Sequence, residues 1–236
     1  MSRRGPVEAP TVYGRNPVRE LIRAARRPVH EVRCLPQLQD EGWLRGVRVR
    51  PASRAELGQI CGSSDHQGIV ARCDPYPYAD LREILEVDGP IVVLDGAQDP
   101  RNLGAISRVA DGAGAAGIVI ARRGSPGVTA VVCKASAGAI EHQLVARVDS
   151  IAGALGEARD RGRLVVGSAP DAETDFRAAG MGRDSVIVMG SEGAGLRPRV
   201  AAACSRMVRI PMAGRVDSLN ISVAAALLLF EARRPI

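Results

Sequence analysis

Lysine is nearly absent from this chain of 236 residues, and aromatic side chains are scarce. Lys134 is the one lysine, so arginine supplies almost all of the positive charge behind the formal net charge of +6. A guanidinium group can pair with phosphate through two parallel hydrogen bonds, although a genome-wide codon bias explains the arginines equally well. Aromatic residues form 3% of the chain, so a nucleic acid would be bound mainly through shape and phosphate contacts, with steep salt dependence.

Long apolar runs are also missing. The longest, from Val223 to Phe230, is far below the roughly 18 residues that a membrane helix needs. The N-terminus contains two arginines with no apolar stretch behind them, so it does not resemble a secretory signal. We therefore predict a disordered tail over residues 1–10, no membrane partner and a cytoplasmic location.

Motifs for metal or disulfide chemistry are not found either. The sequence has five cysteines and three histidines, which are Cys34, Cys61, Cys73, Cys133, Cys204, His30, His66 and His142. No two cysteines form a CxxC pair, and the histidines show no ligand spacing with them or with each other. We expect reduced thiols and no metal.

The front of the chain carries most of the net charge and has the pattern of a separate small domain. Residues 1–74 hold 13 arginines and 8 acidic residues, a net of +5, while the remainder has a net of +1. The expected elements are a helix over 15–27, strands over 29–35, 47–50 and 66–73, and a helix over 53–61. These predict an αβ domain over 11–74, followed by a linker over 75–88 with about one helical turn, because the segment 74–90 holds three prolines.

Residues 89–236 show a different pattern, in which apolar strands alternate with helical segments. The strands are expected over 90–95, 117–121, 143–148, 163–169, 185–190 and 206–211. This alternation predicts an α/β fold with a mostly parallel sheet and helices on both faces. Ligands on such sheets bind at the carboxyl ends of strands, so a functional site is expected in the loops that follow them.

The string GAGAAG at 112–117 matches the glycine fingerprint of dinucleotide-binding proteins, but in the wrong context. The fingerprint needs a strand before it and a helix after it, so that pyrophosphate meets a helix N-terminus. Here a helical segment comes first and a strand follows, and the acidic residue expected about 20 residues further on is missing. We interpret these glycines as a helix end and reject a nicotinamide-dependent enzyme.

Three loops of the second region carry polar residues suited to chemistry. They lie within residues 94–115, 186–198 and 209–234, and each follows a predicted strand. The candidate side chains are Asn102, Arg108, Glu192, Ser218 and Asn220. Taken singly, each loop has an ordinary explanation, namely a solvated helix arginine, a strand-to-helix turn, or a helix N-cap.

Taken together and in this order, the three loops resemble the SpoU family of SPOUT-class RNA ribose 2′-O-methyltransferases. The resemblance rests on DPRNLGAISR (99–108), GSEGAGL (190–196) and IPMAGRVDSLNISVA (210–224), and it covers residues 90–236. It implies a SPOUT-type α/β fold with a deep C-terminal trefoil knot, an exception to the usual absence of knots. It also implies S-adenosyl-L-methionine (SAM) as cosubstrate, no metal, and a homodimer with active sites shared between subunits.

The same resemblance assigns roles to individual residues. It implies that Asn102, Arg108, Glu192, Ser218 and Asn220 are catalytic. It implies that SAM is bound around Met189, Gly190, Ile210, Met212, Ser218 and Leu219. A family proposal makes the motif arginine the general base. Because a guanidinium keeps its positive charge, we favour Arg108 as an electrostatic stabiliser of the developing 2′-oxyanion or the adjacent phosphate. Asn102 and Glu192 are expected to fix its direction, and Ser218 and Asn220 to orient the ribose or SAM.

The first domain shows a shorter resemblance of its own. VYGRNPVRE (12–20) and HQGIVA (66–71) are similar to the ribosomal protein L30e-like RNA-binding domain of the subgroup that methylates a guanosine of 23S rRNA. This implies an RNA substrate-binding domain over 11–74, a catalytic domain over 89–236, and large-subunit rRNA as partner. Three alternatives stay open: a tRNA 2′-O-methyltransferase, an antibiotic-resistance rRNA methyltransferase, and a non-catalytic RNA-binding adapter.

Overall fold

The computed structural model describes residues 10–215 and 218–234, which form two compact units. The first unit contains the chain up to Pro77 together with Val128–His142. The second contains Tyr78–Gly127 and Gln143–Ile236. The tail predicted over residues 1–10 lies outside the described residues except for Pro10.

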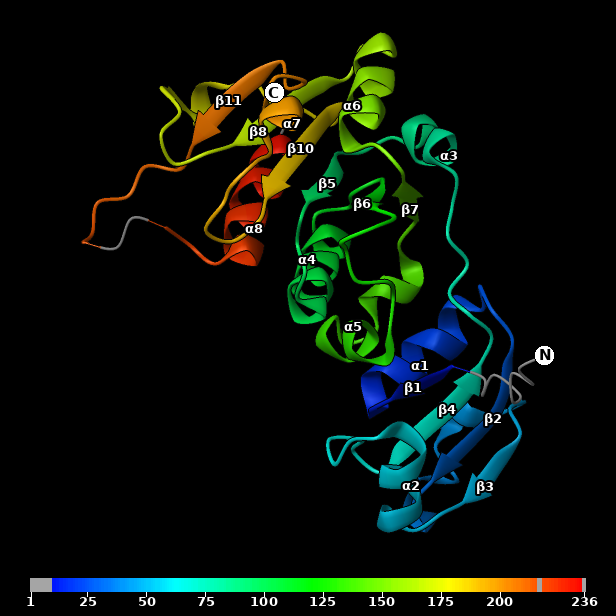
Figure 1. Cartoon of the computed structure of the whole chain (residues 1–236). Coiled ribbons are helices and arrows are strands. Elements are labelled where there is room, and N and C mark those ends of the chain that lie inside the picture. Colours follow the sequence, from blue (N-terminus) through cyan, green and yellow to red (C-terminus); the bar gives the residue numbers. More distant parts are fainter. Residues whose placement is uncertain (1–9, 216–217, 235–236) are drawn as a thin grey trace, which may run out of the picture. The chain divides into compact units, whose positions relative to one another are not determined.

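The first unit is built on a mixed sheet with the strand order β1-β4-β2-β3 (Figure 1). β4 pairs antiparallel with both β1 and β2, and β3 adds parallel to β2. Its elements are β1 (Thr11–Tyr13), α1 (Arg15–Ala24), β2 (Val29–Cys34), the 3-10 turns Pro36–Leu38 and Gly42–Leu44, β3 (Val49–Pro51), α2 (Arg54–Cys61), β4 (Ile69–Cys73), α5 (Ala130–Ala135) and the 3-10 turn Ala139–His142. Each predicted element of this region is present, four of them in shortened form and the strand predicted over 47–50 shifted to Val49–Pro51, and β1 is an additional strand.

Local sequence signals explain where α2 begins and ends. The Ser53 hydroxyl accepts a hydrogen bond from the backbone N–H of Glu56, and the Glu56 carboxylate accepts one from the backbone N–H of Ser53. This reciprocal capping box satisfies backbone donors that a helix start leaves free. Gly62 ends the helix in the left-handed conformation at φ 65°, which a residue without a Cβ adopts most easily.

The segment Val128–His142, from the middle of the chain, belongs to the first unit. It contains α5 and a 3-10 turn, and these contact α1 and β1. Val132 and Ile140 of this segment are fully buried, which explains why it packs with the first unit. Lys134 also donates a hydrogen bond from Nζ to the carbonyl of Asp65 at 2.8 Å.

A buried ion pair holds this segment in place. Arg27 donates from Nε and Nη2 to the two carboxylate oxygens of Glu141, and the two side chains are 4% and 1% exposed. Burial alone would lower the pKa of Arg27, but the hydrogen bonds and charge of Glu141 outweigh it and raise that pKa. Burial also raises the pKa of the neighbouring Cys133 thiol and of Tyr76. Both members of the pair therefore depend on each other for charge compensation.

The second unit contains a seven-stranded sheet in the order β7-β6-β5-β10-β8-β11-β9, in which every pair is parallel. This confirms the α/β fold and the mostly parallel sheet. Its elements are α3 (Leu81–Glu86), β5 (Ile91–Asp95), α4 (Pro100–Gly112), β6 (Gly117–Ala121), β7 (Val145–Val148), α6 (Ile151–Asp160), β8 (Leu164–Ser168), β9 (Thr174–Asp175), the 3-10 turn Phe176–Ala178, β10 (Ser185–Gly190), α7 (Pro198–Ala201), β11 (Arg206–Arg209) and α8 (Ile221–Ala232).

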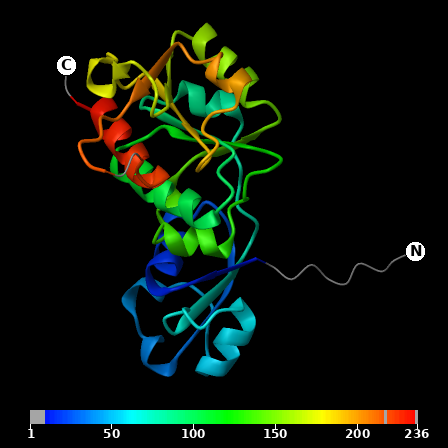
Figure 2. The ribbon, with the colours of Figure 1, turned by 60° about the vertical axis from the view of Figure 1, so that its left-hand side comes forward.

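Helices cover both faces of this sheet. α4 and α8 pack against each other and lie side by side in both views (Figures 1 and 2). Ile91 and Val93 of β5 belong to the apolar core that includes residues of α3 and α6. Because side chains alternate along a strand, the equally buried Val92 and Leu94 face the opposite side of the sheet. Strands buried on both faces explain the continuous apolar runs in the sequence.

The linker and the glycine-rich string GAGAAG can both be compared with the sequence interpretation. The predicted linker contains the helix α3, which Asp80 and Glu83 start with a second capping box. The glycines of GAGAAG lie where α4 ends, at Gly112, and where β6 begins, at Gly117, so the rejection of a dinucleotide fingerprint is confirmed. Among the described residues, no helix has the length and apolar character needed to cross a membrane.

Candidate functional site

The three candidate loops leave the same edge of the seven-stranded sheet. β5 and β10 are adjacent, and Gly190 at the end of β10 is in register with Asp95 at the end of β5. β11 pairs with β8, which in turn pairs with β10. Because all these strands are parallel, their carboxyl ends and the loops that follow lie at one edge. The chain order also reverses between β5 and β10, which is where ligands bind on open α/β sheets.

A direct hydrogen bond joins the first and second candidate loops. Asn102 lies in the first turn of α4, and its Nδ2 donates to Oε1 of Glu192 at 3.0 Å, across 90 residues of sequence. Asn102 is half-buried and Glu192 is exposed, so the carboxylate keeps an oxygen available to a ligand. The structure therefore brings together two of the side chains predicted to be catalytic.

A second contact between these loops involves Asp95, which the sequence analysis did not select. The Asp95 side chain is fully buried at the end of β5 and accepts from the backbone N–H of Arg197 at 2.9 Å and from its Nε at 2.7 Å. The loop after β10 is thus fastened at both Glu192 and Arg197. A carboxylate closing an otherwise apolar strand is the signal that indicates such an anchor, because buried charges need partners.

The loop after β10 folds back tightly on itself, and this requires glycine. Ser191 and Gly195 exchange two backbone hydrogen bonds of 3.0 Å each. A Cβ on Gly190 would lie 2.3 Å from the carbonyl carbon of Gly195, which no side chain tolerates. The close approach of these backbone segments therefore explains the glycine-rich string, and it leaves Glu192 near the tip of the turn.

The third loop, between β11 and α8, extends away from the sheet before the chain enters α8 (Figure 1). Asn220 starts α8 by accepting from the backbone N–H of Ser222 at 2.9 Å and from its hydroxyl at 2.6 Å. Ser218 is exposed, and Val216 and Asp217 lie outside the described residues. The capping explanation therefore holds for Asn220, whose amide nitrogen stays available to a ligand.

Arg108 lies further along α4 and is not brought to Asn102. The two are six residues apart, which rotates their side chains about 240° around the helix axis. Arg108 is exposed and forms no hydrogen bond or ion pair with another residue in the described part of the chain. Its guanidinium is therefore free to meet an external anion.

The residues predicted to hold SAM fall into a buried and an exposed group. Met189 is 3% exposed within β10, and Gly190 and Ile210 are half-buried. Met212 and Leu219 are 39% and 37% exposed, unusual values for large apolar side chains. In the described stretches 211–215 and 218–219, no backbone group bonds to another described residue. Backbone groups that have no partner among the described residues, beside exposed apolar side chains, fit an adenosine group.

The described residues contain no cluster of three or more histidine, cysteine or acidic side chains with metal-binding geometry. The donors of the site are amides, hydroxyls, guanidinium groups and free backbone N–H groups. Such a set suits an anionic or nucleoside-like ligand.

Two protein-family models match this chain. The model of the SpoU rRNA Methylase family matches residues 89–230, and the model named RNA 2′-O ribose methyltransferase substrate binding matches residues 11–79. The first match includes all three candidate loops. The second falls on the basic αβ region at the front of the chain.

Individual relatives agree with these matches. The 23S rRNA (guanosine-2′-O-)-methyltransferase RlmB of Ralstonia nicotianae is 42% identical over 193 residues, which cover 80% of this chain and 78% of that protein. YacO of Bacillus subtilis, named for the TrmH family of tRNA/rRNA methyltransferases, is 42% identical over 196 residues, with the same two coverages. The crystal structure of an AdoMet-bound rRNA methyltransferase from Sinorhizobium meliloti superposes with a TM-score of 0.79 at 27% identity, covering 95% and 87% of the two chains.

These matches confirm the resemblance found in the sequence, and they confirm SAM as the cosubstrate of the family. The family model extends over more than half of the chain. The chain belongs to the SpoU family of SAM-dependent RNA 2′-O-methyltransferases.

Proposed function

We propose that this enzyme methylates the ribose 2′-oxygen of a guanosine in large-subunit rRNA. The observation that carries the proposal is the contact between Asn102 and Glu192, which joins two motif loops at the carboxyl edge of the sheet. The choice of rRNA is supported by the similarity to a 23S rRNA guanosine methyltransferase and by the basic first domain. The RNA would place the enzyme in the cytoplasm.

The site must make a neutral ribose hydroxyl reactive toward a methyl group. SAM supplies that methyl group together with its own leaving group. Asn102 and Glu192 orient the substrate, and the fixed charge of Arg108 stabilises the developing 2′-oxyanion or the adjacent phosphate. Ser218 and Asn220 orient the ribose or SAM from the third loop. The free guanidinium of Arg108 supports this role, because no partner in the described part of the chain competes for it.

The SAM site would use the third loop together with the end of β10. Backbone groups of 211–215 and 218–219, which have no backbone partner in the described part of the chain, would bind the adenine edge, and Ile210, Met212 and Leu219 would pack against its ring. Met189 is buried in the sheet and contributes through its backbone. Gly190 contributes through its backbone, since Gly195 already fills the space that a side chain at this position would need.

The deep trefoil knot is part of the proposal. Its support is that the chain leaves β11 near one end of the sheet and returns in α8, which contacts β10 and α4 nearer the middle. The L30e-like character of the first domain is likewise proposed. It rests on the four-stranded αβ arrangement of that unit and on the substrate-binding family match.

A homodimer is proposed through the outer face of α8. Val223, Leu227 and Phe230 are 49%, 40% and 55% exposed, and their spacing places them on one face of the helix. The opposite face, with Ala225, Leu228 and Leu229, is fully buried. An exposed apolar stripe on a helix next to the candidate site suits the interface of a dimer whose subunits share active sites.

Methyl transfer from labelled SAM tests the substrate. We expect label in unmodified large-subunit rRNA and none in bulk tRNA, and we expect Arg108→Ala to abolish the label while SAM binding persists. Label only in tRNA would contradict the assignment of rRNA as the substrate but would still agree with the proposed methyl transfer. A protein that binds RNA but neither binds SAM nor transfers methyl would be an adapter, which contradicts the proposed activity.

A further inference from the structure

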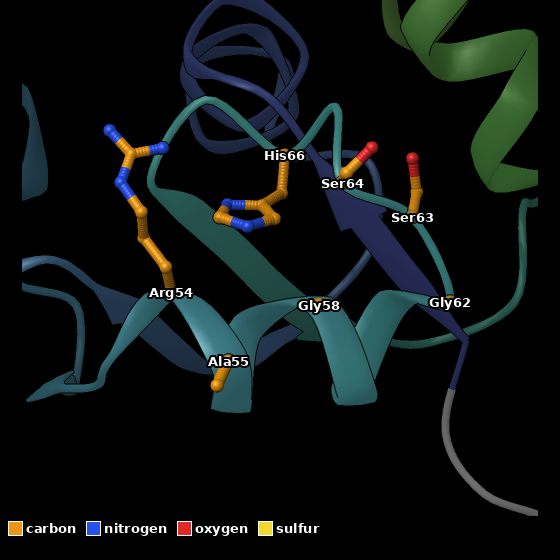
Figure 3. Close-up of a pocket in the computed structure, with 7 residues that line it drawn as sticks. All are labelled: Arg54, Ala55, Gly58, Gly62, Ser63, Ser64 and His66. Carbon is orange, nitrogen blue, oxygen red and sulfur yellow. The ribbon is translucent and has the colours of Figure 1, made fainter.

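A hollow of about 550 Å³ lies beside α2 in the first unit, and no residue of the methyl-transfer loops lines it. Its wall combines one face of α2 with the loop that follows the helix (Figure 3). The lining residues are Arg54, Ala55, Gly58, Gly62, Ser63, Ser64 and His66. The volume falls in the range of small-ligand sites and exceeds what a single phosphate fills.

The helix side of the hollow has no side chain larger than a methyl group at three successive positions. Ala55 and Gly58 lie three residues apart on one face of α2, and Gly62 is the residue that ends the helix four positions further on. Gly58 has neither a positive φ nor a crowded Cβ position, since the nearest atom to an added Cβ is 3.7 Å away. A helix-interior glycine destabilises the helix relative to alanine. Neither backbone geometry nor packing requires this glycine, and its effect is to keep the hollow open.

His66 supplies an independent sign of a ligand. The side chain is 3% exposed, and its Nδ1 accepts the backbone N–H of Gly68 at 3.0 Å. An N–H can only donate, so Nδ1 carries no proton and the neutral ring holds its proton on Nε2. Nε2 has no partner among the described residues, and the ring lines the hollow between Arg54 and Ser64 (Figure 3). The ring is nearly buried, but its Nε2–H is not among the buried unpartnered atoms, so it opens to the hollow, where an occupant can accept from it.

The remaining polar groups of the hollow are also donors. Arg54 is exposed and makes no hydrogen bond or ion pair with another described residue. Ser63 already accepts from the backbone N–H of Asp65 at 3.1 Å, which leaves its hydroxyl hydrogen to donate. No carboxylate lines the hollow among the residues that the structure describes. The occupant must therefore offer acceptors and tolerate or carry negative charge.

We propose that this hollow binds one unpaired nucleotide of the RNA substrate, with its phosphate at Arg54 and an acceptor on its base at Nε2 of His66. This inference rests on the proposed function and adds a recognition site remote in sequence from the methyl-transfer loops. A base held in a duplex cannot enter a hollow of the protein surface, whereas the base of an unstacked nucleotide can enter it and reach Nε2. Recognition by hydrogen bonds also suits a first unit with few aromatic side chains.

Three variants of the full chain distinguish the loss of the nucleotide site from a general loss of folding. Gly58→Leu fills the hollow while improving helix propensity, so it should fold at least as well as the wild type. His66→Asn keeps an oxygen where Nδ1 accepts from Gly68 and removes the Nε2 donor. Gln59→Leu is the matched control, because it adds the same leucine to the same helix at an exposed position that does not line the hollow.

The test measures binding of a mixed-sequence single-stranded RNA and of a fully paired duplex by fluorescence anisotropy. For the single strand, Gly58→Leu should weaken binding about tenfold or more, and His66→Asn about fivefold, the loss expected for one hydrogen bond. Gln59→Leu should stay within about twofold of the wild type, and duplex binding should change little in all variants. Equal single-strand affinity in all four proteins would overturn the proposal, and so would an equal loss of duplex binding.

A second readout follows the His66 imidazole nitrogens by NMR as nucleoside 5′-monophosphates or inorganic phosphate are added. A nucleotide-specific shift of the Nε2 signal that disappears in Gly58→Leu supports the site. An identical shift with inorganic phosphate would reduce the hollow to a general anion site and contradict the nucleotide assignment. Because both readouts measure binding, they stand apart from methyl transfer. If the wild type transfers no methyl group but Gly58→Leu and His66→Asn still weaken RNA binding, the proposed function is rejected while the nucleotide site is supported.

Discussion

The buried pair between Arg27 and Glu141 gives the sharpest prediction about stability. Arg27→Ala removes a guanidinium that is 4% exposed and leaves a carboxylate that is 1% exposed without its charged partner. Removing one member of such a pair costs about 3–5 kcal/mol of the free energy of unfolding, because the remaining charge stays buried. For a protein of this size, each kcal/mol lowers the melting temperature by about 2–4 °C, so the midpoint should fall by roughly 6–20 °C.

Two further variants isolate the cause. Replacing both residues by apolar ones, Arg27→Met with Glu141→Leu, leaves no unpaired charge and should recover most of the loss. The exposed pair Arg82–Glu157, with nitrogen and oxygen 3.6 Å apart and side chains 76% and 37% exposed, serves as control. Arg82→Ala should cost less than about 1 kcal/mol.

The assay is thermal and urea unfolding of the full chain, followed by circular dichroism. Because Glu141 belongs to the inserted segment Val128–His142, the loss should appear in the unfolding of the first unit. A cost below about 1 kcal/mol for Arg27→Ala would refute the reasoning, since it would mean that the pair is neither buried nor coupled in solution. A double variant as unstable as Arg27→Ala would show that packing, not charge, is the cause.

The other predictions concern the site, the interface and the thiols. Arg108→Lys should lower methyl transfer by roughly 100-fold at unchanged SAM affinity, and Glu192→Gln by about tenfold, both measured with labelled SAM and saturating RNA. Leu227→Arg with Phe230→Arg should convert a dimer to a monomer in analytical ultracentrifugation, whereas Val87→Arg, an exposed apolar control at 40% exposure, should not. Burial raises the pKa of Cys73 and of Cys204 to about 11, so iodoacetamide at pH 8 should label Cys61 before either of them in native protein, read by mass spectrometry.

Each of these has a contradicting outcome. Near-normal turnover of Arg108→Lys would reject the geometric role of the guanidinium. A monomeric wild type would reject the dimer. For the thiols, a raised pKa stabilises the fold at pH values below 9, and this contribution is lost as the pH rises towards 11. Rapid labelling of Cys73 at pH 8 would therefore contradict its burial.

Much of the fold of the second unit could be predicted from its sequence, because the local pattern of each apolar strand agrees with the parallel sheet that the strands form together. The strand Ile91–Asp95, with the sequence IVVLD, is apolar up to its last residue, and a parallel sheet buries both faces of such a strand. The three motif loops each follow a strand, so their gathering at one edge is a consequence of parallel topology. The hydrogen bond between Asn102 and Glu192 shows that the first two of these loops meet at this edge.

What the sequence could not predict depends on long-range partners. The inserted segment Val128–His142 shows no local sign of belonging to the first unit, because its anchor is a pair 114 residues apart, Arg27 and Glu141. The carboxylate of Asp95 at the end of an apolar strand indicates an anchor, but its partner Arg197 lies 102 residues away in the sequence and could not be identified from it. The tautomer of His66 likewise depends on a backbone N–H that only the folded loop supplies.

The most direct test of the central claim is the chemistry of the product. Large-subunit rRNA methylated by the wild type should yield, after alkaline hydrolysis and mass spectrometry, one alkali-resistant dinucleotide that carries a 2′-O-methylguanosine. The same analysis with Asn102→Ala should show this product strongly reduced, because the contact to Glu192 is lost. A methyl group found on a base, or an alkali-labile product, would contradict ribose 2′-O-methylation at the site formed by the three loops.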